Sequence, residues 1–195
     1  HLLRLVDETG LIRPKVALVR DGTSLILGVA ARDYQGLAGK ITGFLWERDI
    51  TLKQAHLFSS LNYGVALDFF HIKGSDAATL QSLAKELEDD IEQNPFLEDQ
   101  LISTLPEIHG TASIREWSPG LFCLRFEATE ATKGIVYALA MKANHFLKAN
   151  IFGLVAHSLK DKSFVSIYHS LPQGIDLDQA DEILKAHFNS RFDRP

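Results

Sequence analysis

Several features are scarce in this sequence, and each scarcity excludes a class of protein. Among the 195 residues there is one cysteine, Cys123, which excludes an internal disulfide and a cysteine-rich zinc site. Lysine and arginine total 20 against 25 acids, without a basic run, which disfavours a nucleic-acid partner. No apolar run approaches the ~18 residues that span a bilayer, and the first residues turn polar too early for a signal peptide. These absences predict a cytoplasmic protein.

Motifs of the common enzyme classes are also missing. There is no G-x-S-x-G, no H-E-x-x-H and no dinucleotide-binding glycine pattern. Residues 36–40 read Gly-x-x-Gly-Lys, but the glycines are too close for a P-loop and Ile41 follows the lysine. Cys123 lies in an apolar context and is expected to be inert, while the acidic run 86–90 is expected to be a solvated helix face. We therefore expect no catalytic activity and no cofactor.

The chain contains an internal repeat with an offset of 98 residues between its halves. Two glycines and two histidines recur in the same order, although one histidine is displaced three residues further. The corresponding residues are Gly22 and Gly120, Gly36 and Gly134, His56 and His157, and His71 and His169. The pattern predicts a duplicated module: residues 11–94, a connector over 95–110, and residues 111–190.

Each half reads as strand, strand, helix, strand, strand, helix. Apolar residues spaced along 37–45 predict one buried helical stripe, and Asn62-Tyr63-Gly64 is a hairpin signal. Such units favour an α+β class in which helices cover one face of an antiparallel sheet. The expected strands are 15–19, 24–31, 50–60, 65–73, 111–117, 121–128, 151–159 and 163–170. The expected helices are 36–48, 77–93, 133–149 and 178–188.

Two segments of the first half resemble a known family. Residues 33–37, Asp-Tyr-Gln-Gly-Leu, look like the D-x-x-G-L entry of ACT domains. Residues 55–60 and 64–70 resemble the A-x-I-x-T/S-T/S … G-x-A-x-D-x-F pattern in the C-terminal ACT pair of bacterial uridylyltransferase/uridylyl-removing enzymes, which respond to glutamine. The resemblance covers residues 15–92 and reaches the second half only through the repeat.

This resemblance implies two ferredoxin-like modules that pair and bind an amino acid at the turn after a strand. It predicts a regulatory, amino-acid-sensing module of nitrogen metabolism with a glutamine-like ligand. Such a module would control a catalytic domain elsewhere in a larger chain or complex. The partners expected are a small-molecule amino acid and a host enzyme, with pairing either within the chain or in a homo-oligomer such as a dimer.

The candidate ligand site lies at the turn beginning with Asp33. Asp33 would receive an α-ammonium group, and the backbone that starts the next helix would hold a carboxylate. The alternative is that Asp33 only caps the helix. The second half has Ala131 in place of Asp33, and Lys133 there would meet a carboxylate. The predicted ligand residues are Asp33, Tyr34, Gln35, Gly36, Leu37, Ala38, Lys133 and Gly134.

The histidines form a second candidate site. His56 and His71 are expected to lie directly opposite each other across a hairpin, and His157 with His169 likewise. Paired imidazoles suit zinc, a pH-sensitive patch, or packing on a sheet face. Alternation places the first pair on the face opposite Asp68, together with Phe58 and Phe69. Three alternatives therefore remain: sheet-face packing between modules or subunits, a ligand-free oligomerisation module, and a metal- or proton-responsive switch.

Overall fold

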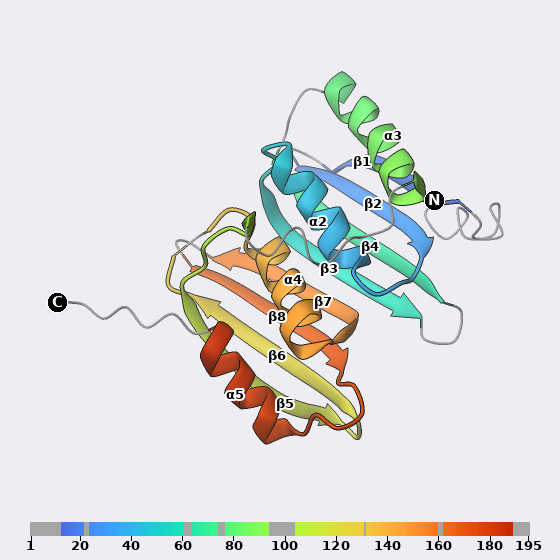
Figure 1. Cartoon of the computed structure of the whole chain (residues 1–195). Coiled ribbons are helices and arrows are strands. Elements are labelled where there is room, and N and C mark those ends of the chain that lie inside the picture. The colour runs from blue at the N-terminus through green and yellow to red at the C-terminus, as the bar shows by residue number, and fades with distance from the viewer. Residues whose placement is uncertain are drawn as a thin grey trace.

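The computed structural model describes residues 13–21, 24–60, 64–73, 77–93, 104–130, 132–159 and 162–188. Within them the expected order of elements occurs twice, each boundary within two residues of the prediction (Figure 1). The first half contains β1 (Lys15–Asp21), β2 (Ser24–Arg32), α2 (Leu37–Glu47), β3 (Leu52–Ser60), β4 (Val65–Ile72) and α3 (Ala77–Gln93). The second half contains β5 (Gly110–Ser118), β6 (Leu121–Ala128), α4 (Ile135–Leu147), β7 (Asn150–Leu159), β8 (Lys162–Ser170) and α5 (Leu177–His187). Gly22, Asn62, Tyr63 and Ala131 lie outside the described residues, as does much of the connector, so the module boundaries stay a prediction.

The strands form one antiparallel sheet of eight, in the order β1-β2-β4-β3-β7-β8-β6-β5. The two modules join edge to edge within the chain, because β3 pairs with β7 from Gln54 opposite His157 to Phe58 opposite Gly153. This pairing satisfies backbone groups that two free edge strands would expose. The expectation that the modules pack through their sheet faces is therefore wrong.

Each module is a ferredoxin-like unit in which one strand has changed its place in the sequence. A β-α-β-β-α-β unit is the usual form. Here the last strand of that series comes first in the sequence. β1 pairs with β2 at the edge of the first module, and β5 pairs with β6 at the edge of the second. The described helices cover one face of the sheet (Figure 1). The predicted α+β class with two ferredoxin-like modules is confirmed.

The core lies between the sheet and this helical layer. Ala55, Leu57, Phe70 and Ile72 are buried on the helix-covered face, as alternation predicted. The helices α2 and α4 lie side by side across the module boundary, where a Cβ added to Gly43 would be 2.8 Å from the Tyr137 ring. This close approach makes the module boundary part of the core.

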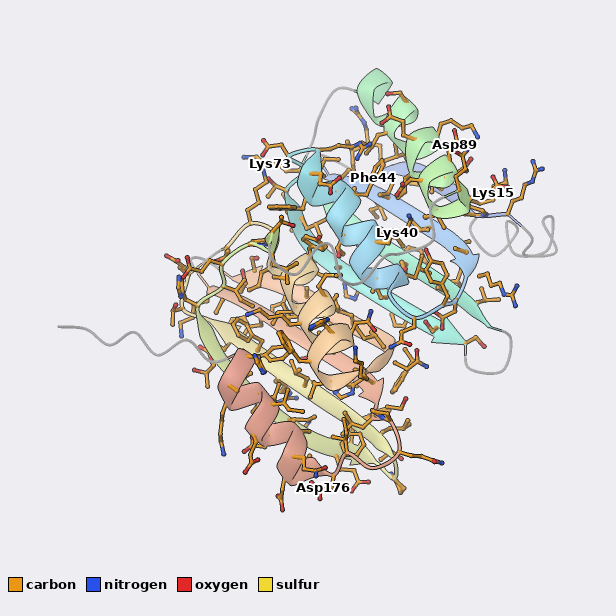
Figure 2. All side chains as sticks on the ribbon, in the orientation of Figure 1. Lys15, Lys40, Phe44, Lys73, Asp89 and Asp176 are labelled. Atoms are coloured by element: carbon orange, nitrogen blue, oxygen red, sulfur yellow. The ribbon has the colours of Figure 1, made fainter. Side chains whose placement is uncertain are left out.

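Polar contacts stabilise both outer helices. Lys40 of α2, which Figure 2 labels, has its Nζ 3.3 Å from Asp90 Oδ2 of α3. The helix α5 begins at a capping box, in which the Asp176 carboxylate accepts the Gln179 N–H and the Gln179 side chain accepts the Asp176 N–H. Such a cap satisfies two backbone donors that a helix start otherwise leaves open.

The strand register corrects the predicted repeat. Leu27 pairs with Phe70 in the first half, and Leu124 pairs with Ile167 at the equivalent place in the second. His71 therefore corresponds to Tyr168, and the match between His71 and His169 is a coincidence of spacing. The glycine match holds at the helix starts, since Gly36 and Gly134 both have left-handed backbones, with φ of 95° and 78°.

Candidate functional site

The turn between β2 and α2 is built around Asp33 and Gly36. The Asp33 N–H donates to the Gly64 carbonyl at 2.8 Å, which fixes the end of β2 against the β3–β4 hairpin. Gly36 then takes a left-handed conformation that starts α2, and no side chain caps this helix start. The Asp33 carboxylate instead accepts hydrogen bonds from the Ser59 hydroxyl and the Tyr34 N–H. The helix-capping role considered for Asp33 is therefore wrong.

A small cavity of about 20 Å³ lies beside this turn, at the boundary of the modules. On this measure it holds about one water molecule. The Gln35 Nε2 donates to Asn144 Oδ1 of α4 at 2.8 Å, which links the turn to the second module. The first module lines the cavity with residues 33–39 and Leu57, Ser59, Ala66 and Asp68. The second module lines it with Ala140, Met141, Asn144 and residues 149–153.

Asp68 is a site residue that the sequence reasoning missed. Its side chain is 3% exposed and lies on the helix-covered face of β4. Burial raises its pKa to about 8, the hydrogen bond from the Phe58 N–H opposes this, and the nearby charge of Asp33 adds to it. Burial also raises the pKa of Asp33. The alternation of β4 predicts this acid on an otherwise apolar, buried face. A carboxyl group in such a place is the sequence signal that marks a candidate site residue.

Tyr34 also lines this cavity, and its hydroxyl lies within reach of the charge of Asp90 on α3. Its hydroxyl is buried and has no hydrogen-bond partner among the described residues. Burial, followed by the charge of Asp90, raises its pKa to about 12, so the hydroxyl keeps its proton. A protonated hydroxyl without a partner is free to bond to a bound molecule.

Lys133 and Gly134 lie at a different cavity, on the other side of the β3–β7 pair from the first. Gly134 starts α4 without a side-chain cap, and Lys133 forms an ion pair with Asp49. The cavity measures about 210 Å³ and is lined by both modules. One wall is formed by Trp46 of α2 and Tyr137 of α4, whose rings stack with centroids 5.4 Å apart. The predicted ligand residues thus divide between two separate cavities.

The histidines do not form the predicted opposed pairs. Four residues, 61–64, join the paired ends of β3 and β4, and His56 lies opposite Phe69 while His71 lies opposite Gln54. The first two rings are diagonal neighbours with centroids 6.3 Å apart.

The second pair separates completely. His157 lies opposite Phe164, and His169 lies opposite Ile151 on the helix-covered face. Burial lowers the pKa of His169 to about 4, so this ring stays neutral at ordinary pH. In the described part of the chain, no three His, Cys, Asp or Glu residues are grouped to hold a metal ion.

Comparisons with known proteins add little to these observations. No family model matches the chain, and no curated protein matches it in sequence. Among solved structures it is similar to the crystal structure of aspartate kinase from Synechocystis, at 10% identity and a TM-score of 0.46. That match covers 85% of this chain and 27% of the other, so this chain spans about a quarter of that protein. At this TM-score, the fold assignment rests on the chain's own strand order. No helix among the described residues is long and apolar enough to cross a membrane.

Proposed function

We propose that this chain is a regulatory module, without catalytic activity of its own, that senses an amino acid at the Asp33 turn. The observation that carries the proposal is the boundary cavity where Asp33 and Asp68 of one module meet Asn144 of the other. A ligand there touches both modules, so its binding energy depends on how they pack. Such a difference in affinity between two packings is what an allosteric module requires.

The acids suit the ammonium group of an amino acid. Asp33 is half-buried and Asp68 is buried, and both line this cavity. A cation beside two carboxyl groups favours their ionised forms and lowers both pKa values. The start of α2, which no side chain caps, supplies backbone donors for a carboxylate on the same ligand.

In the present structure the site is closed. The volume of about 20 Å³ is too small for any amino acid, and the Gln35–Asn144 hydrogen bond joins the two modules among its lining residues. Binding therefore requires this amide pair to separate and α2 to shift against α4. We expect that movement to be transmitted to a host catalytic domain. Glutamine is the first ligand to test, because its carboxamide can replace the Gln35 side chain as the partner of Asn144.

A thermal-melt screen with the twenty amino acids at millimolar concentration tests the proposal. A ligand at ~100 times its Kd adds about 2.7 kcal/mol, a rise of roughly 5–10 °C for a chain of this size. We expect one amino acid to give this rise, Asp33→Asn to abolish it, and Lys133→Met in the other cavity to leave it intact. A flat screen, or a rise that survives Asp33→Asn, would sink the proposal.

The uncovered face of the sheet supports a second candidate, an oligomerisation module whose occupant is a second copy of the chain. Phe58 is 53% exposed there, and Leu67, Phe69 and Tyr168 are half-buried beside it. Eight strands of 7 to 10 residues, about 4.8 Å apart, present a face of roughly 1,000 Å² per copy, which is enough for the ~800 Å² that a standard interface buries on each side. Sedimentation would show a dimer that Phe58→Lys dissociates; a monomer at high concentration would exclude this role.

A further inference from the structure

We propose that the larger cavity is a second ligand site, for an organic monocarboxylate with an apolar body and no ammonium group. The site is independent of the Asp33 turn, so it stands or falls apart from the proposed function. Its volume of about 210 Å³ is room for a molecule of roughly ten non-hydrogen atoms.

The charged side chains that line this cavity are lysines, while the acids Glu47 and Asp49 lie beside it. The described lining residues include Lys53 and Lys133 and neither aspartate nor glutamate. Lys133 is 37% exposed and is paired with Asp49, whose own side chain is 94% exposed. A ligand carboxylate closer to the low-dielectric cavity would compete successfully with this solvated partner, because charge pairs gain strength as water is excluded.

The groups that would receive an ammonium ion are replaced in this half. Val165 lines this cavity at the position that Asp68 occupies beside the small one, and it is 1% exposed. The sequence has Ala131 in place of Asp33. An amino acid entering here would place its ammonium group near a lysine without a carboxylate to neutralise it, which is costly.

The remaining walls define the body of the ligand. The stacked rings of Trp46 and Tyr137 form one side, and the buried Ala156 and Val165 of the sheet form another. At the floor, the Ser158 and Ser163 hydroxyls are 3.0 Å apart and share one hydrogen bond, which leaves a donor for the second carboxylate oxygen. Apolar walls with few polar groups are typical of small-molecule sites, where the polar groups set the orientation.

Intrinsic fluorescence provides a direct test, because Trp46 lines the cavity and the other tryptophan, Trp117, does not. In a Trp117→Phe background, the binding of 3-phenylpropanoate is titrated and compared with that of two matched probes. We expect saturable quenching with 3-phenylpropanoate. Phenylalanine, which adds only the ammonium group, and 3-phenylpropanamide, which removes only the charge, should each bind at least tenfold more weakly.

Three substitutions assign the binding to this cavity. Lys133→Met should weaken 3-phenylpropanoate binding about tenfold through loss of a charged hydrogen-bond partner. Asp49→Asn should strengthen it two- to threefold by removing the competing carboxylate. Asp33→Asn should leave it unchanged. Equal binding of phenylalanine and 3-phenylpropanoate, indifference to Lys133→Met, or no saturable signal with 3-phenylpropanoate at ~10 mM would each overturn the proposal.

Discussion

The small and large cavities occupy equivalent places on the two sides of the β3–β7 pair, yet their chemistry is opposite. The small one has two acids and an amide bridge and is closed; the large one has two lysines and aromatic walls and is open. The backbone at both helix starts is the same, with a left-handed glycine and no side-chain cap. The two modules share the backbone frame that presents these donors, while a few side chains decide charge and volume.

The largest expected effect comes from moving the buried acid into the other module. Val165→Asp places a carboxyl group on the buried face of β8, where the native residue is 1% exposed. We expect the free energy of unfolding at pH 8 to fall by about 3–5 kcal/mol, because burial opposes ionisation. Urea titrations at pH 5 and pH 8 measure it, and the loss should be smaller at pH 5. Equal losses at both values would show that shape and not charge is responsible.

The reverse change concerns Asp68 itself. Its pKa of about 8 lies above the ordinary 3.8, so the folded chain holds a proton that the unfolded chain releases, and stability falls as pH rises from about 4 to 8. Asp68→Asn removes that loss and can still accept the Phe58 N–H. We expect the variant to be more stable than the parent by roughly 2–4 kcal/mol at pH 8 and nearly equal at pH 4. A constant difference across this range would contradict the raised pKa.

Asp68 also shows how far the sequence could go. Alternation in β4 correctly placed it beside Phe70 and Ile72 on the buried face, and glycine at 36 and 134 correctly marked two helix starts. The sequence could not show that residues of both modules line the same cavities, because that depends on the β3–β7 pairing between distant segments.

The histidine prediction failed for a related reason. Register follows from the length of the connecting loop, and the sequence does not show how many residues of 61–64 remain unpaired. A shift of two residues keeps His56 and His71 on one face but makes them diagonal. In the second hairpin the predicted and observed registers differ by an odd number of residues, so His169 lies on the opposite face from His157.

Gly134 and Gly120 of the second module separate the cost of a left-handed backbone from the cost of a steric clash. A Cβ at Gly134 would lie 2.6 Å from both Pro106 and the Trp46 ring, at a φ of 78°. Gly120 has a similar φ of 73° with no atom near its added Cβ. We expect Gly134→Ala to cost about 2–3 kcal/mol and Gly120→Ala about 1 kcal/mol, the difference being the clash. Equal costs in urea unfolding would mean that Trp46 moves aside freely.

The smallest effect tests whether the amide bridge holds the small cavity closed. Asn144 is 4% exposed and accepts a hydrogen bond from the exposed Gln35. Asn144→Ala should therefore cost only about 1 kcal/mol of stability, since water can replace the lost partner of Gln35. Hydrogen exchange at the first turn of α2 should nevertheless quicken, because the turn is released from α4. The large cavity serves as the internal control, and exchange at the first turn of α4 should not change. If exchange quickens equally at both helix starts, one movement of the modules opens both cavities, and the Gln35–Asn144 hydrogen bond does not hold the small cavity closed by itself.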